Sequence, residues 1–131
     1  MPRIEESYCS IFSSFLKTMK SEITNSLEHV LIKCITACET CMTMCLQEEN
    51  VKMMVKCIQL DRDCADVCTL TARFVARNSP HAPHVMRECI EICKACAAEC
   101  AKHEDDHCQK CAEACQECAD ACEDWLATKK V

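Results

Sequence analysis

The chain has 131 residues, the length of a single domain, with little room for a large catalytic scaffold. Its net charge is −6, and it has neither a basic block nor a patch of basic and aromatic residues, so we expect no nucleic-acid partner. No apolar run approaches the length of about 18 residues that a membrane span requires, so we expect no membrane segment. The first twenty residues lack the features of a secretory signal, and a cytosolic protein with reduced thiols is therefore predicted.

Residues 1–23 are predicted to be a helical N-terminal extension of the main domain, which comprises residues 24–131. Apolar side chains recur here at helical spacing, namely Ile4, Tyr8, Ile11, Phe12, Phe15, Leu16 and Met19. The pattern predicts an additional helix that packs outside the main domain or against another subunit. Cys9 lies in this extension, and the pattern does not assign it a role.

The other sixteen of the seventeen cysteines lie between residues 34 and 122 in four groups, and within each group they recur in steps of three and four residues if Asp61 fills the one empty position, between Cys57 and Cys64. These steps average 3.5, the spacing of side chains that line the seam of a helix bundle. Glycine is absent and proline occurs three times, a composition that leaves long helices uninterrupted. The predicted helices cover roughly 24–47, 51–77, 82–102 and 105–128. Their connections are short, which predicts an all-α fold, an antiparallel up-down-up-down four-helix bundle.

So many cysteines in a core are not explained by packing. Between Cys108 and Cys122 the other apolar residues are all alanines, whereas one buried leucine would contribute about 1.5–3 kcal/mol. Disulfides would crowd into one narrow core and would oppose the reducing cytosol. Thiolates three or four residues apart on a helix can bind one metal ion, and such soft ligands select Cu(I), zinc or iron–sulfur clusters. Zinc prefers closed sets of four ligands, so a continuous file of thiols suits Cu(I) best.

The predicted ligands for multiple Cu(I) ions are the cysteines of the four helices: Cys34, Cys38, Cys41, Cys45, Cys57, Cys64, Cys68, Cys89, Cys93, Cys96, Cys100, Cys108, Cys111, Cys115, Cys118 and Cys122. Further candidates lie at one end of the predicted bundle: Met53, Met54, Asp61, His103 and His107.

Each further candidate also has an ordinary structural interpretation. The methionines could fill the core, and the histidines could be solvated at helix ends. Asp61 occupies a cysteine position in the second helix. It could be a ligand, a proton acceptor for thiols, or the ion-pair partner of Arg62 or Arg87.

Four segments resemble the bacterial copper storage proteins, in particular their cytosolic branch. They are "CITACETCMTMC", "CIQLDRDCADVC", "ECIEICKACAAEC" and "HCQKCAEACQECADAC". The resemblance implies a bundle lined with cysteines, storage of many Cu(I) ions without enzymatic activity, and a homo-oligomer, commonly a tetramer. Copper donor and acceptor proteins would be its partners. Residues 1–24 lie outside the resemblance.

Two other functions remain open, a zinc or iron–sulfur metalloprotein and a redox-sensing helical bundle. Stoichiometry separates them. Bridging thiolates would hold on the order of sixteen Cu(I) ions, tetrahedral zinc would number about four, and a sensor would bind none. We also predict that copper enters the bundle at the end with His103 and His107 rather than at the end with Pro80 and Pro83.

Overall fold

The computed structural model describes residues 11, 13–14 and 27–129. Its four long helices are α2 (Leu27–Cys45), α3 (Val55–Ala76), α4 (Ala82–Cys100) and α5 (Asp106–Lys129), and a short 3-10 helix, η1 (Val51–Met54), leads into α3. No strand occurs in these described residues, so the all-α prediction is confirmed. The predicted N-terminal extension, 1–23, including its helix and Cys9, lies outside the described residues except at positions 11, 13 and 14.

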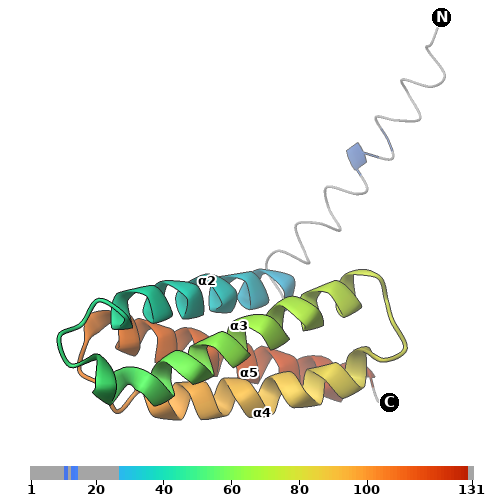
Figure 1. The fold of residues 1–131 in the computed structure, drawn as a ribbon. Helices are drawn as coiled ribbons and strands as arrows, with labels where there is room; N and C mark the ends of the chain where they lie inside the picture. The colour runs from blue at the N-terminus through green and yellow to red at the C-terminus, as the bar shows by residue number, and fades with distance from the viewer. Residues whose placement is uncertain (1–10, 12, 15–26, 130–131) are drawn as a thin grey trace, which may run out of the picture.

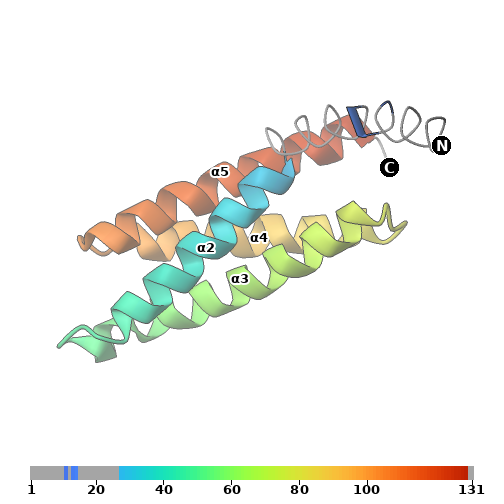
Figure 2. The ribbon, with the colours of Figure 1, turned by 90° about the horizontal axis from the view of Figure 1, so that it is seen from above.

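The helices form the predicted antiparallel bundle. α2 packs against α3 and α5, and α4 packs against the same two helices on the other side. The α2–α3 and α4–α5 connections lie at one end of the bundle, and the α3–α4 connection lies at the opposite end (Figure 1). We call these the two-loop end and the one-loop end. Figure 2 shows from above that neighbouring helices cross at an inclination, as side-chain ridges packing into grooves require.

The one-loop connection is built from residues with special backbone properties. Asn78 has a φ of 51°, a left-handed conformation that asparagine adopts more readily than most residues. This conformation ends α3, because the N–H groups of Asn78 and Ser79 then donate to the carbonyls of Val75 and Phe74. Pro83 lies in the first turn of α4, where its missing N–H is not needed. The chain therefore reverses within a few residues.

The core of the bundle is a file of sulfur atoms. All sixteen cysteines of the four helices are fully buried. At the one-loop end the file is continued by Leu31, Thr71 and Met86, which are also fully buried. Among the described helices, none combines the length and the apolar character needed to cross a bilayer.

Candidate metal-binding core

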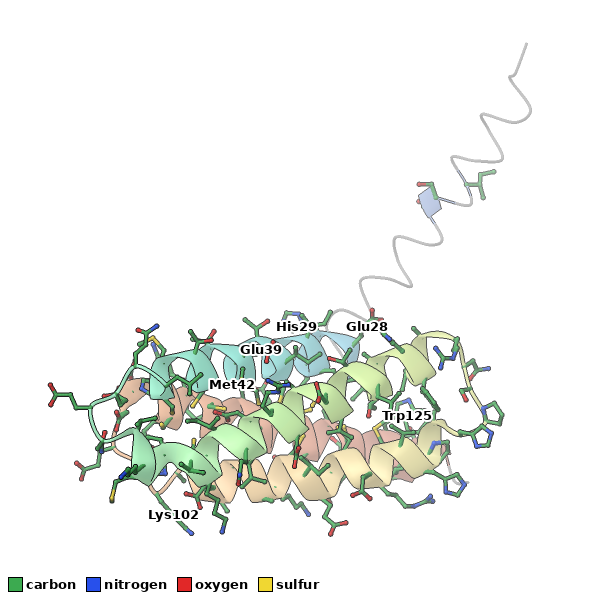
Figure 3. The ribbon with its side chains drawn as sticks, in the orientation of Figure 1. Glu28, His29, Glu39, Met42, Lys102 and Trp125 are labelled. Atoms are coloured by element: carbon green, nitrogen blue, oxygen red, sulfur yellow. The ribbon has the colours of Figure 1, made fainter. Side chains whose placement is uncertain are left out.

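The inward direction of the thiols follows from their spacing. In α5 the five cysteines and the small residues Ala114 and Ala119 share the buried face, while Glu113, Glu117 and Asp120 are exposed. A helix turns once in 3.6 residues, so steps of three and four keep every thiol on this face. The same pattern on the other helices brings four rows of thiols together along the bundle axis. Figure 3 shows the side chains on the ribbon, with sulfur atoms between the helices.

Neighbouring sulfur atoms lie close together without bonding. Their separations run from 3.3 Å between the Sγ atoms of Cys57 and Cys100 to 4.0 Å between those of Cys64 and Cys68. A disulfide requires about 2.05 Å, and all sixteen thiols are free. Two sulfurs that bind one metal ion tetrahedrally, with metal–sulfur bonds of about 2.3 Å, lie about 3.8 Å apart. The thiols are therefore close enough to share a metal ion without rearrangement of the helices.

The thiols form groups of four in which all Sγ atoms lie within 4.8 Å of one another. Five such groups are Cys34–Cys64–Cys68–Cys93, Cys34–Cys38–Cys64–Cys115, Cys38–Cys96–Cys111–Cys115, Cys41–Cys45–Cys57–Cys108 and Cys68–Cys89–Cys93–Cys118. Six thiols belong to two of these groups: Cys34, Cys38, Cys64, Cys68, Cys93 and Cys115. Four of these five groups overlap and are therefore not independent sites, whereas the Cys41–Cys45–Cys57–Cys108 group shares no thiol with them.

Asp61 lies where the three- and four-residue spacing of α3 would place a cysteine, and it is fully buried. Its Oδ1 accepts hydrogen bonds from the thiols of Cys96 and Cys111, both at 3.3 Å, and of Cys100 at 3.5 Å. Its Oδ2 accepts one from Cys57 at 3.8 Å. Among the alternatives left open by the sequence, these contacts are those of a proton acceptor for thiols.

The environment of Asp61 favours its protonated form. Burial, together with the negative charge that Cys111 and Cys57 would carry as thiolates, raises the pKa of Asp61 to about 8. The side chain is thus a carboxyl group that changes its protonation state close to neutral pH. It lies near the two-loop end of the thiol file, where it accepts hydrogen bonds from Cys57 of its own helix and from cysteines of α4 and α5.

His107 lies at the two-loop end, where its imidazole meets the last thiols of the file. Its Nδ1 is 3.5 Å from Sγ of Cys108, 3.7 Å from that of Cys41 and 3.9 Å from that of Cys45. Burial raises the pKa of the Cys45 thiol to about 11 and also raises the pKa of Cys108. Without a metal ion these thiols are therefore protonated at neutral pH. A metal ion that binds them must displace their protons.

His103 has a different environment. Its Nε2 lies 3.1 Å from Oε2 of Glu99, a buried carboxylate that also pairs with Lys102 at 3.3 Å and Lys56 at 3.8 Å. Burial alone would raise the pKa of Glu99, but the hydrogen bonds from His103 and Lys102 outweigh it and lower the pKa. His103 thus belongs to a surface network of charges at the rim of the two-loop end.

The two candidate methionines differ in their exposure to solvent. Met54 is fully buried among the core residues, whereas Met53 is 70% exposed. The structure therefore brings Met54 and His107 to the thiol file, and it leaves Met53 and His103 at the rim.

The sequence analysis did not predict which carboxylates contact the two histidines. Glu99 precedes His103 by four residues, a spacing that places both on one helix face and could have been noticed. The partner of His107 is Glu48, whose Oε1 lies 3.1 Å from Nε2. These two residues are 59 positions apart, so only the bundle topology brings them together.

A groove of about 630 Å³ runs along the surface between α2 and α5. Exposed Ile32 and Met44 line it, and so do His107 and Cys111 at its inner wall. His107 therefore borders both the groove and the thiol file.

The chain matches the copper storage protein family over residues 19–127. A cysteine-rich protein of Bacillus subtilis (strain 168), YhjQ, is 45% identical over 83 residues, which are 63% of this chain and 77% of that protein. The Cu(I)-bound copper storage protein BsCsp3 is 40% identical with a TM-score of 0.74, over 77% of this chain and 95% of that one. A cytosolic copper storage protein from Streptomyces lividans, solved with five coppers, is 39% identical with a TM-score of 0.77, over 81% and 93%. This chain belongs to the copper storage protein family.

Proposed function

We propose that this protein stores Cu(I) as multinuclear thiolate clusters inside the bundle. The observation that carries the proposal is the overlap of the four-thiol groups, in which six thiols each belong to two groups. A thiol shared between two groups can hold two ions only by bridging them. Cu(I) accepts bridging thiolates and few ligands per ion, so it can fill the whole file. The membership of the chain in the copper storage family supports the same metal.

The two alternative functions, a zinc or iron–sulfur metalloprotein and a redox-sensing bundle, agree less well with these observations. Closed tetrahedral zinc sites need four ligands each, so neighbouring groups that share a thiol could not be filled as separate closed sites. A redox sensor requires thiols that are accessible and readily ionised, whereas these thiols are fully buried. Storage also needs no catalytic centre, and we propose that the chain is not an enzyme.

The proposed ligands are the sixteen buried cysteines together with Asp61 and His107. Met54 is buried in the same core cluster as the thiols and would complete a site at the two-loop end, while His103 and Met53 would bind copper only transiently at the rim. The proposal is supported by the four thiols that donate to the Asp61 carboxylate and by the three that lie within 3.9 Å of His107 Nδ1. Mixed sulfur, oxygen and nitrogen coordination is thus available at and near this end.

An anaerobic titration of the reduced protein tests the function. We expect Cu(I) to bind until the metal-to-protein ratio reaches the order of sixteen per chain. Zinc, added to the same preparation as a matched comparison, should saturate near about four per chain. Saturation by both metals near four would indicate closed tetrahedral sites, and the absence of tight Cu(I) binding would contradict storage.

We further propose a cytosolic location and a homo-oligomer, a tetramer by resemblance to the family. The location is supported by the Streptomyces lividans relative, which is described as cytosolic. Copper would arrive from donor proteins and leave to acceptors. Light scattering of the purified full chain gives the number of subunits, and a monomer would contradict the assembly.

A further inference from the structure

His107 has two nitrogens with different surroundings. Nδ1 faces the thiols of Cys41, Cys45 and Cys108, and Nε2 faces carboxylates. The imidazole is only 10% exposed, so its nitrogens depend on protein groups rather than on water for hydrogen bonds. A neutral imidazole carries one proton, and the hydrogen bond of one nitrogen decides whether the other is free to bind a metal.

The nearest partner of Nε2 is Glu48, at 3.1 Å, in the connection between α2 and α3. Asp105 also approaches Nε2, but its Oδ2 is 3.6 Å away, too far for a good hydrogen bond. Glu48 is itself fixed by the turn that follows α2, because its backbone N–H donates to the carbonyl of Cys45 at 3.2 Å. The residue that orients His107 is thus tied to the helix that supplies two of the thiols.

We propose that Glu48 is a positioning residue for copper capture, which fixes His107 with its proton on Nε2 and its Nδ1 lone pair directed at the thiols. The proposal rests on the storage function proposed above and adds the device that prepares its outermost site. In the neutral imidazole, an Nε2–H group that donates to Glu48 leaves Nδ1 without a proton, so that Nδ1 can bind Cu(I) together with the neighbouring sulfurs. With the proton on Nδ1 instead, the imidazole would face these sulfurs with an N–H group and could not ligate.

His103 shows that the arrangement around His107 is specific. It also has a carboxylate at Nε2, but Glu99 serves two lysines as well, and the hydrogen bonds of His103 do not extend to a thiol. Only at His107, within the described residues, do a carboxylate on one nitrogen and thiols on the other occur together.

The test uses substitutions of Glu48 in the full-length protein. Glu48→Leu removes the acceptor, whereas Glu48→Gln keeps an amide oxygen that can accept from Nε2–H. The neighbouring exposed residue Glu49 supplies the matched control, Glu49→Leu. Nitrogen NMR of histidine-labelled, metal-free protein at pH 8 reports which imidazole nitrogen is protonated, and His107→Gln assigns the signal. Competition with a chromogenic Cu(I) chelator measures the affinity for the first equivalent of copper.

We expect the wild-type, Glu48→Gln and Glu49→Leu proteins to hold the His107 proton on Nε2. Glu48→Leu should shift protons to Nδ1 and weaken binding of the first Cu(I) about 10-fold, within the range seen when partners of metal ligands are removed. Final capacity should stay the same, because the sixteen thiols are untouched. The rescue by glutamine separates a positioning role from a merely structural one, which would not change the protonated nitrogen.

An unchanged tautomer and first-copper affinity in Glu48→Leu would overturn the proposal. So would an effect of Asp105→Asn larger than that of Glu48→Leu, since it would assign the role to Asp105. Failure of the storage function would appear differently, as low Cu(I) capacity in the wild-type protein. The NMR measurement needs no metal and remains decisive in that case.

Discussion

Asp61 illustrates at the residue scale how a polar side chain is accommodated in a core of thiols. A buried carboxylate without partners would be very unfavourable, but four thiols donate to its oxygens. Thiols are weak donors, and burial still raises the pKa of Asp61 to about 8. The residue is therefore tolerated in the core of the metal-free protein as a protonated acid.

The stability of the metal-free protein should depend on this proton. The folded chain keeps the Asp61 proton up to about pH 8, whereas the unfolded chain loses it at the ordinary pKa of 3.8. Between these values the unfolded state binds fewer protons, so the contribution of Asp61 to the free energy of unfolding falls as pH rises. Asp61→Asn removes this dependence. We expect the stability of the variant relative to the wild type to rise by on the order of 5 kcal/mol between pH 4 and pH 8, measured by urea unfolding with reductant and chelator.

Asp63→Asn is the control, because Asp63 is exposed on the same helix. Its stability relative to the wild type should be nearly constant over the same pH range. A difference between Asp61→Asn and the wild type that does not change with pH would show that Asp61 is ionised in the folded protein.

At the scale of elements, α5 is the helix that depends most on its thiols. Between Cys108 and Cys122 its buried face carries only cysteines and alanines, and larger apolar residues, Trp125 and Leu126, come only near its C-terminal end. The other helices carry larger apolar side chains on their buried faces, such as Leu31 in α2, Val67 in α3 and Met86 in α4. The aliphatic residues suffice to assemble the bundle, but they leave the first part of α5 with little large apolar surface to bury.

Copper should therefore stabilise α5 more than the rest of the bundle. We expect circular dichroism to show a helical metal-free protein, and Cu(I) to raise its melting temperature by at least about 10 °C through mass action. Amide hydrogen exchange should slow most in residues 108–122. The internal reference is the end of the same helix, residues 125–129. A disordered metal-free chain, or a melting temperature that copper does not change, would contradict this account.

The sequence allowed the helices to be predicted because cysteine marks their buried faces. Each predicted helix matches an observed one within a few residues at either end, and the largest difference is at the start of the second. There Val51–Met54 form a 3-10 turn before α3 begins at Val55. The thiol file was predictable for the same reason. The contact of Glu48 with His107 could not be predicted, because it depends on how two loops pack together in the fold. The periodic spacing of residues in the sequence carries no information about that packing.

At the scale of the whole molecule the two ends of the bundle differ in chemistry. At the two-loop end the file finishes with Cys45, Cys57 and Cys108, next to His107, which also borders the surface groove. At the one-loop end it is followed by the fully buried Leu31, Thr71 and Met86, with partly buried residues packed around them. Figure 3 shows Trp125 near this end and Lys102 near the other. Leu31, Thr71, Met86 and Trp125 bring one side chain from each of the four helices to the one-loop end.

This asymmetry favours entrance and exit of copper at the two-loop end. An ion held by His107 is one helical step from the next thiol, so ligand exchange can pass it inward. We expect the double substitution of His103 and His107 with phenylalanine to slow both loading and removal of Cu(I) at least about 10-fold, while final capacity is nearly kept. The matched control replaces His81 and His84, exposed at the one-loop end, in the same way. Stopped-flow transfer from and to a Cu(I) chelator gives both rates. Slowing by the second pair, with no effect of the first, would place the entrance at the one-loop end.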